Sequence, residues 1–272
     1  MKRILFFLLK PTFGSKRFHR FYSVMRNIAL QGLNFRNNDI ATDGELFYLK
    51  SISRHYGENT APLVLFDVGA NVGDYSRLLN DTFRTHKKKI YSFEPFSKAY
   101  ADLKKLEQAA PEITAVNLGL GEKREKVTFL SSSEYSKVGG LYNKDFSEYN
   151  FSLNIREEAS FDTIDNFCAD HQIDRIHLLK VDVEGHDFFA LKGAENMLKT
   201  NRIDFIQFEY GAANYLSKTY LYDFFQLLAP NYHLCHLLKN GYFEIREYNT
   251  DIEIHLLTNY VAINKSLPFK LN

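Results

Sequence analysis

Residues 63–73 contain the sequence feature that most restricts how this chain can fold. A largely apolar run at residues 63–68 has the length and composition of a buried parallel strand. Gly69 and Gly73 then bracket a short turn, and Asp74 stands where the N-cap of a helix is expected. A strand, a glycine turn and a helix start together predict half of a doubly wound nucleotide site, in which the glycines let a ligand approach the backbone.

A second apolar run, residues 90–93, ends at Glu94, which lies 21 residues after Gly73. An acidic side chain at this distance from a glycine turn can accept hydrogen bonds from ribose hydroxyls. The two glycines alone could simply form a tight strand-to-helix turn, but such a turn does not need an acidic residue at position 94. We therefore expect the loop and Glu94 to bind a ligand that contains a ribose.

The spacing of the glycines indicates which class of ligand this is. The dinucleotide fingerprint requires glycine at its first, third and sixth positions, which here are Gly69, Asn71 and Asp74, so two of the three positions fail. Asp74 would also place negative charge near a pyrophosphate. A ligand with a ribose but no phosphate fits better. S-adenosylmethionine is such a ligand, and its sulfonium and ammonium groups tolerate acidic neighbours such as Asp67.

The composition excludes several classes of protein. The chain has 272 residues with a net charge of +1 and 25% charged residues, which gives no electrostatic footprint for nucleic acid. The hydrophobic fraction of 45% is ample for a core. Cys168 and Cys235 stand far apart, which excludes a disulfide framework and favours a reducing, cytoplasmic location with each thiol structural. The His and Cys spacings give no zinc site.

The N-terminus has a distinctive composition. Its apolar run, residues 4–9, is too short to span a bilayer or to form a typical signal sequence. Basic residues then alternate with aromatic ones, namely Lys16, Arg17, His19, Arg20 and Arg26 with Phe13, Phe18, Phe21 and Tyr22. This pattern fits an amphipathic segment that touches a membrane or a lipid-linked substrate. We favour the interpretation that this segment is a helix that packs on the main domain. No other segment is a transmembrane candidate.

The rest of the chain alternates strand-like and helix-like segments, which indicates a parallel sheet with helical crossovers. The expected strands lie near residues 63–68, 89–94, 113–118, 176–183, 203–209, 232–238, 242–247 and 259–264, with a short extra strand at 127–130. The expected helices lie near residues 74–85, 97–109, 160–170, 187–199 and 214–228. The predicted fold class is α/β, a doubly wound, Rossmann-like, seven-stranded and mostly parallel sheet with an antiparallel C-terminal strand and a helical N-terminal extension.

Two domains follow from this pattern, a helical extension over residues 1–59 and a catalytic domain over residues 60–272. Residues 131–155 are rich in Ser, Tyr, Asn and Gly, and we interpret them as a lid over the cleft, with a disordered surface insertion as the alternative. Ser160 is expected to cap the helix that follows, and Asn240-Gly241 predicts a hairpin turn in the tail.

Together these motifs resemble a known family. Asp-Val-Gly-Ala-Asn-Val-Gly at 67–73, Phe-Glu-Pro at 93–95 and Asn-Leu-Gly-Leu-Gly at 117–121 are similar to the cofactor motifs of class I S-adenosylmethionine-dependent methyltransferases. Leu-Lys-Val-Asp-Val-Glu-Gly-His-Asp at 179–187, followed by Leu-Lys-Gly-Ala at 191–194, resembles the FkbM-type signature, and 160–165 resembles the segment that precedes it. The resemblance covers about residues 60–210. It implies O-methylation, often of sugars or secondary metabolites.

The resemblance also implies where the cofactor lies, namely over the carboxyl ends of the first four strands. Its methionine part would face the backbone of Gly69, Ala70, Asn71 and Gly73. Glu94 would hold the ribose, Phe96 and Leu118 would flank the adenine, and Asn117 would lie near its edge. Phe96 and Leu118 could equally be core residues.

Transfer of a methyl group to an alcohol requires alignment and removal of the hydroxyl proton. Three candidates for the base follow the strand near 176–183, namely Asp182, Glu184 and His186. Strand alternation would send Asp182 and Glu184 to one face, and we prefer Asp182 as substrate anchor or base. His186, which titrates near neutral pH, is the rival, although it could also be a helix-start residue. Glu184 could instead cap the helix or brace the loop.

The remaining alternatives concern metal, acceptor and activity. Asp182 and Glu209 could share a magnesium ion, but no third ligand is evident, so no metal ligand is assigned. A nicotinamide-dependent oxidoreductase and a catalytically inactive scaffold are the rival functions. The neutral charge and the Tyr-containing segment at 131–155 favour a glycan or polar metabolite as acceptor over nucleic acid.

Overall fold

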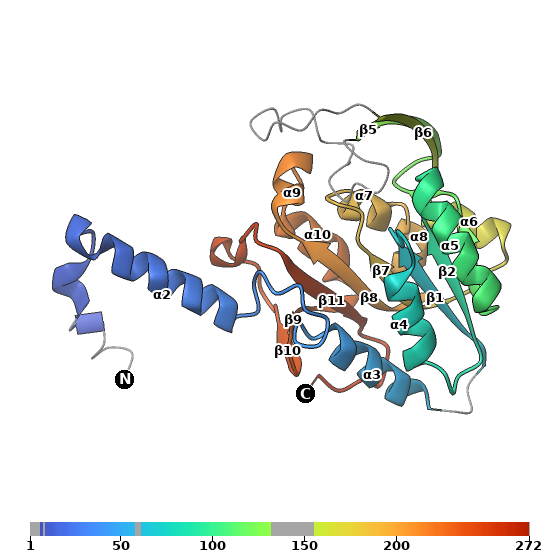
Figure 1. Cartoon of the computed structure of the whole chain (residues 1–272). Coiled ribbons are helices and arrows are strands. Elements are labelled where there is room, and N and C mark those ends of the chain that lie inside the picture. Colours follow the sequence, from blue (N-terminus) through green and yellow to red (C-terminus); the bar gives the residue numbers. More distant parts are fainter. Residues whose placement is uncertain (1–5, 8, 58–60, 132–154, 272) are drawn as a thin grey trace.

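The computed structural model describes residues 6–7, 9–57, 61–131 and 155–271, and an eight-stranded sheet forms its centre (Figure 1). The strands follow the order β10-β9-β11-β8-β7-β1-β2-β3. Their bounds are β1 Leu63–Val68, β2 Lys88–Phe93, β3 Ile113–Val116, β7 Ile176–Val181, β8 Ile203–Tyr210, β9 Tyr232–Leu238, β10 Gly241–Glu244 and β11 Thr258–Asn264. The five strands from β3 to β8 are parallel, and β11 runs antiparallel to both β8 and β9.

The predicted doubly wound α/β class with an antiparallel C-terminal strand is therefore confirmed. The sheet has one strand more than the seven expected, because β10 extends its edge as the hairpin partner of β9. A hairpin is expected here from Asn240-Gly241, but its two turn residues are Lys239 and Asn240, since Gly241 already pairs with Leu238.

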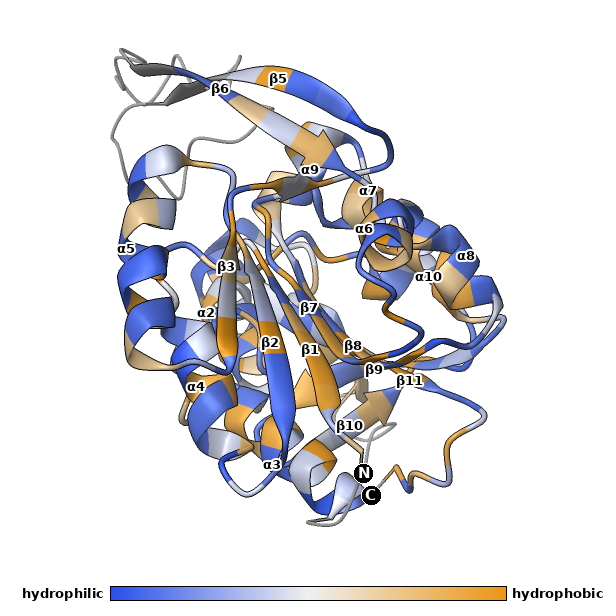
Figure 2. Cartoon of the chain, turned by 90° about the vertical axis from the view of Figure 1, so that its right-hand side faces the viewer, coloured by the Kyte–Doolittle hydropathy of each residue, from blue (hydrophilic) through white to orange (hydrophobic). Residues whose placement is uncertain are grey.

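Helices cover both faces of the sheet, since successive strand side chains point to opposite faces. Leu63 and Leu65 of β1 belong to one apolar layer, and Phe66 and Val68 belong to the other. The first layer is covered by α3 (Glu45–Tyr56) and α4 (Asp74–Thr82), and the second by α6 (Ile164–Asp170), α7 (Asp187–Lys192), α8 (Glu195–Lys199) and α10 (Leu221–Leu228). Figure 2 shows the two groups of helices on either side of the sheet, with α5 (Ser97–Ala109) beside α4.

Three helices differ from those expected from the sequence. Ser160 lies inside a strand, and Thr163 caps α6 instead, with its hydroxyl accepting from the Asn166 amide at 3.0 Å. The helix expected over 187–199 is interrupted after Lys192, where Gly193 packs so tightly that a Cβ would lie 2.0 Å from a backbone oxygen. The helix expected over 214–228 is divided into α9 (Ala212–Ser217) and α10 by Lys218, which has a φ of 57°.

A second, three-stranded sheet lies beyond the carboxyl ends of the parallel strands (Figure 2). Its strands are β4 (Gly119–Leu120), β5 (Glu125–Ser131) and β6 (Ile155–Asp162), in the order β4-β6-β5. β5 and β6 pair antiparallel, so the expected short strand at 127–130 is part of a longer one. The lid expected over 131–155 falls on residues 132–154, which lie outside the described residues, and its two end residues belong to β5 and β6.

The N-terminal extension has two parts with different environments. Tyr48, Leu49 and Ile52 of α3 are fully buried against the sheet. In contrast, α2 (His19–Gly32) projects away from the body of the molecule and contributes no buried residue (Figure 1). The expectation that this segment packs on the main domain is therefore wrong for α2. None of the helices in the described residues is long and apolar enough to cross a membrane.

Candidate functional site

The loop between β1 and α4 approaches neighbouring backbone too closely for any side chain at its first residue. Gly69 has a φ of 83°, and a Cβ there would lie 1.9 Å from the carbonyl oxygen of Asp182. Its amide donates to the carbonyl of Phe93 at 3.0 Å, which ties the loop to the end of β2. Gly73, with a φ of 88°, is itself the N-cap of α4, so Asp74 is the first helical residue and not the cap expected. The loop, β2 and Asp182 are thereby brought together.

Glu94 lies under this loop and is only 4% exposed. Its Oε2 accepts from the amide of Asn71 and its Oε1 from the amide of Phe96, both at 2.9 Å. Burial raises the pKa of Glu94 to about 7, although the two amide donors oppose this. Asn117 donates from Nδ2 to the carbonyls of Glu94 and Pro95 at 2.9 and 3.1 Å. Each carboxylate oxygen has a further lone pair, so Glu94 retains the capacity to accept from a ribose.

The other residues expected around the cofactor lie close to the same loop. Ala70 is buried, and its amide also donates to the end of β2 at 2.9 Å. Asn71 adopts a left-handed φ of 49°. Phe96 packs with Phe161 and other residues of the three-stranded sheet, whereas Leu118 is half-buried against the main core. These positions are compatible with a cofactor site, and the contacts of each residue with a cofactor remain predictions.

A row of polar residues crosses the sheet one step below its carboxyl edge. Asp67 pairs in register with Ser92 on one side and with Lys180 on the other, and Lys180 pairs in turn with Gln207. All four side chains are buried. Ser76 of α4 completes the row, since its hydroxyl donates to Asp67 Oδ2 at 2.6 Å and lies 2.6 Å from the Ser92 hydroxyl.

Lys180 is the buried cation at the centre of this row. Its Nζ lies 3.1 Å from Asp182 Oδ2, 3.6 Å from Asp67 Oδ1 and 4.8 Å from the ring centroid of Tyr75. Burial disfavours its charge, but Asp182, Asp67 and Glu45 outweigh this, so the pKa of Lys180 is raised. Asp67 Oδ1 has no hydrogen-bond partner among the described residues, and burial raises the pKa of Asp67. Asp67 is therefore a fully buried acid below the loop, and its expected place beside the cofactor stays a prediction.

No motif in the sequence assigns a role to Lys180, although its spacing from Asp182 is a signal. Lys180 stands two residues before Asp182, so strand alternation places the two side chains on one face. The remaining links of the network come from distant elements, since the Tyr75 hydroxyl donates to Gln207 at 2.7 Å and Gln207 donates to Glu45 and, at 3.1 Å, to Asn259.

The three candidates for the base have different environments. The side chain of Asp182 is 34% exposed and is held by Lys180. Glu184 does not share its face through strand alternation, because β7 ends at Val181 and Glu184 has a left-handed φ of 52°. His186 stacks on Phe189, and burial lowers its pKa to about 4. A pKa of about 4 is close to that of an ordinary carboxyl group, so basicity does not separate His186 from the two acids. The candidates differ in their contacts, since Asp182 is held by a buried cation whereas the His186 ring is packed against Phe161 and Phe189, and the identity of the base stays a prediction.

Further carboxyl groups gather around Asp182. Asp187 is buried and accepts from the amides of Val183 and Gly185 at 3.3 and 3.0 Å, and burial together with Asp182 raises its pKa to about 8. Burial raises the pKa of Glu209 as well, and Asp182 and Asp187 add to this. Within the described residues, no group of three His, Cys, Asp or Glu side chains is placed to hold a metal ion. The magnesium site considered for Asp182 and Glu209 is therefore not supported.

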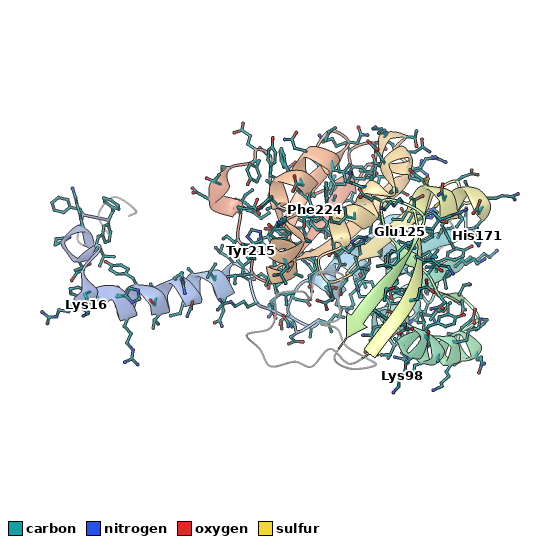
Figure 3. All side chains as sticks on the ribbon, turned by 90° about the horizontal axis from the view of Figure 1, so that it is seen from above. Lys16, Lys98, Glu125, His171, Tyr215 and Phe224 are labelled. Carbon is teal, nitrogen blue, oxygen red and sulfur yellow. The ribbon has the colours of Figure 1, made fainter. Side chains whose placement is uncertain are left out.

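An aromatic patch lies beside the turn at residues 182–186, between β7 and α7. Its members are Tyr210, Tyr215, Tyr220 and His255, whose ring contacts the three tyrosines at 5.3, 6.0 and 6.0 Å. Tyr215 is 69% exposed and is labelled on the body in Figure 3. Helix α9, which carries it, packs on the turn, since a Cβ on Gly185 would lie 2.7 Å from a backbone oxygen at Ala213. The sequence offers no motif for this patch, because it joins residues from β8, α9 and a distant loop.

Comparisons with known proteins identify the family. The family model described as "Methyltransferase FkbM domain" matches residues 67–243, and the chain belongs to this family. The resemblance drawn from the motifs is thus confirmed. No curated protein matches the chain.

Several solved methyltransferases have a similar arrangement. A methyltransferase FkbM from Methylobacillus flagellatus KT has 18% identity and a TM-score of 0.46, covering 88% of this chain and 60% of that chain. The plantazolicin methyltransferase BamL, in complex with a triazolic desmethylPZN analog and SAH, has 11% identity and a TM-score of 0.45 over 85% of this chain and 87% of that one. A precorrin-6y C5,15-methyltransferase from Geobacter metallireducens GS-15 has 10% identity and a TM-score of 0.41 over 81% and 87%. The chain thus spans about 60% of the length of the FkbM structure.

Proposed function

We propose that this member of the FkbM family binds S-adenosylmethionine and transfers its methyl group to a hydroxyl of a sugar, glycan or other polar metabolite. The observation that carries the proposal is the placement of Glu94. A buried carboxyl group, held by the amides of Asn71 and Phe96, lies beside a loop whose first residue, Gly69, has no room for a side chain. These bonds brace the turn, and the lone pairs that they leave on the carboxylate can accept from the hydroxyls of a ribose.

The residues around the loop fit the cofactor. Positive φ angles at Gly69 and Asn71 shape the turn, and its amides at Gly69, Ala70 and Asn71 are bonded to the end of β2 and to Glu94. These bonds hold the turn in one conformation beside Glu94, as a preformed cofactor site requires. Asp182 supplies negative charge, which suits a sulfonium and an ammonium group and disfavours a pyrophosphate. When bound, the cofactor would supply an electrophilic methyl group.

The residues of this chain would supply alignment and a proton acceptor. We assign the acceptor role to Asp182, because it is partly exposed at the end of β7 and because Lys180, 3.1 Å away, fixes its orientation. The substrate oxygen would form its new bond to the methyl carbon as the carbon–sulfur bond breaks, with S-adenosylhomocysteine as the leaving group and the hydroxyl proton passing to Asp182 Oδ1 or Oδ2. His186 is the alternative, but its ring is packed against Phe161 and Phe189.

The aromatic patch supports a sugar or polar metabolite as the substrate class. Tyr215 and Tyr220 are 69% and 46% exposed, and α9, which carries Tyr215, packs on the turn that carries Glu184. Such amphipathic rings can contact the C–H faces of a sugar while bonding its hydroxyls. O-methylation, the glycan class and a cytoplasmic location remain proposals. The last is supported by the two buried free thiols, Cys168 and Cys235.

Calorimetric titration with S-adenosylmethionine, S-adenosylhomocysteine and NAD tests the cofactor. We expect micromolar binding of both sulfur ligands and none of NAD. Binding of NAD alone would favour the oxidoreductase, and binding without methyl transfer to any acceptor would favour an inactive scaffold. A screen of sugar acceptors then tests the substrate class, with Tyr215→Ala as the variant expected to raise KM. The exposed Tyr222→Ala on α10 is its control.

A further inference from the structure

The N-terminal arm, defined as residues 6–7 and 9–36, has a surface that the proposed chemistry does not use. Four apolar side chains of α2 occupy positions i, i+3, i+4 and i+7, which places them on one face of the helix. These are Phe21, Val24, Met25 and Ile28, and they are 47%, 51%, 48% and 58% exposed. The opposite face carries His19, Ser23, Arg26 and Asn27. An amphipathic helix normally buries its apolar face, but nothing in the described part of the chain covers this one.

Aromatic residues extend the apolar surface toward the tip of the arm. Phe13 contacts Phe6 and Tyr22, with ring centroids 5.3 and 5.8 Å apart, and Tyr22 contacts Phe21 at 5.2 Å. Phe7 is 78% exposed. Aromatic rings with one wet and one apolar side are typical of the interface between water and lipid.

The charge of the arm identifies the surface that it fits. Residues 1–38 contain eight Lys and Arg residues and no Asp or Glu, whereas residues 39–272 contain 26 basic and 33 acidic residues, a net charge of −7. The overall charge of +1 therefore conceals a strongly basic arm on an acidic body. An anionic surface attracts the arm and repels the rest of the molecule, which also fixes the orientation of the chain on that surface. Figure 3 shows Lys16 near the far end of the arm, well away from the body.

We propose that the N-terminal arm docks this chain on an anionic lipid bilayer, with the apolar face of α2 lying in the interface. The helix, 14 residues or about 21 Å long, would lie parallel to the membrane plane with Phe21 and Ile28 immersed. The basic side chains would reach the phosphate level, since Arg and Lys extend their charged ends away from apolar surroundings. The contact is peripheral, as neither the length nor the composition of α2 suits a crossing.

Co-sedimentation of the full-length protein with vesicles tests the proposal without any cofactor, so its outcome is independent of the methyltransferase function. We expect binding to phosphatidylglycerol–phosphatidylcholine vesicles and little to pure phosphatidylcholine. Binding should weaken as salt rises from about 0.1 M to about 1 M, where the Debye length falls from about 10 to about 3 Å.

Two variants separate the apolar and the electrostatic parts of the interaction. Val24→Asp/Ile28→Asp should lower the partition coefficient about 100-fold, since two immersed side chains are lost. Arg17→Gln/Arg20→Gln/Arg26→Gln should lower it by about the same factor, at roughly fivefold for each basic residue. Matched controls are Phe243→Ser, an exposed aromatic on β10, and Lys87→Gln/Lys126→Gln/Lys270→Gln, which remove three exposed charges from the body. Both controls should bind like the wild type.

Because α2 contributes no buried side chain, the variants should keep the thermal midpoint of the wild type, and this is measured alongside. Equal vesicle binding by the arm variants and the controls would overturn the proposal. An absence of binding to anionic vesicles would also overturn the proposal. In that case a dimer seen by analytical ultracentrifugation would show that the apolar face joins two copies of the chain.

Discussion

Replacement of Lys180 by methionine tests whether the buried polar row supports the candidate site. Asp67 is fully buried, and its Oδ1 lies 3.6 Å from Lys180 Nζ. The change therefore leaves Asp67 without a compensating charge. Breaking a buried ion pair in this way costs about 3–5 kcal/mol of unfolding free energy. Lys192→Met is the matched control. Its ion pair with Glu122 has a similar N–O distance of 3.1 Å, but both side chains are about half exposed, so the loss should stay below about 1 kcal/mol.

The pH dependence of the Lys180→Met defect identifies Asp67 as its cause. Burial already raises the pKa of Asp67, and Lys180 opposes that rise. Without Lys180 the pKa rises further, so the folded chain holds a proton that the unfolded chain releases above a pH of about 4. Such a group contributes its full stability at low pH and loses it as the pH increases. The defect should therefore be larger at pH 8 than at pH 5.

Urea denaturation of the wild type, Lys180→Met and Lys180→Met/Asp67→Asn at both pH values measures this. We expect the double variant to recover most of the lost free energy at pH 8, because both buried charges are then absent. A double variant as unstable as the single one, or a defect that does not change with pH, would refute the reasoning. Methyl transfer should stay low in the double variant, since Asp182 still lacks the amino group that orients it.

Three further predictions concern individual residues of the site. Gly69→Ala should lower the unfolding free energy by about 2 kcal/mol or more in urea denaturation, because Gly69 has a φ of 83° and lies close to the Asp182 carbonyl. Gly32→Ala is the control and should cause no such loss, because a Cβ there meets nothing within 4 Å. Glu94→Gln should weaken cofactor binding about tenfold in calorimetry, and affinity equal to the wild type would remove Glu94 from the ribose site. Asp182→Asn should lower kcat at least about 100-fold while His186→Asn changes it by less than about tenfold, and the reverse order would make His186 the base.

The sequence is sufficient to predict the parts of the site that lie close together in the chain. The strand, the glycine loop and Glu94 follow from local composition and spacing, because a buried parallel strand and a tight turn each require particular residue types. The five parallel strands are found where the sequence predicts them, and the hairpin is found with its turn one residue before Asn240-Gly241. The number of strands in the sheet differs from the seven expected, since the sequence pattern does not show that the hairpin joins the sheet edge.

The polar row could not be predicted, because it depends on the register between strands that are far apart in the chain. Asp67 and Lys180 are separated by more than a hundred residues, and their contact requires both the order of the strands and their alignment. The break at Gly193 has the same origin, since it reflects a backbone contact with Gly121 from another element. In α2 the amphipathic pattern is clear from the sequence, but the pattern alone cannot tell a packed face from one left exposed.

The raised pKa values at the carboxyl edge lead to a last prediction about the cofactor. Burial raises the pKa of Glu94 to about 7 and that of Glu209 above its usual range, so both groups carry protons over part of the neutral range. Ribose hydroxyls bind best to an ionised Glu94, and a sulfonium favours ionised carboxylates nearby. Binding should therefore release protons, and affinity should rise from pH 6 to about pH 7.5 and then level off.

Calorimetric titration in buffers with different ionisation enthalpies counts the released protons. S-adenosylmethionine and S-adenosylhomocysteine share the ribose but differ in the charge on sulfur. Proton release through Glu94 should therefore be the same for both ligands. Any additional proton release with S-adenosylmethionine would come from the carboxyl groups around Asp182. In Glu94→Gln the common part should disappear while the excess remains. Proton uptake, or affinity that does not change between pH 6 and pH 8, would mean that the acidic edge faces something other than a cationic cofactor.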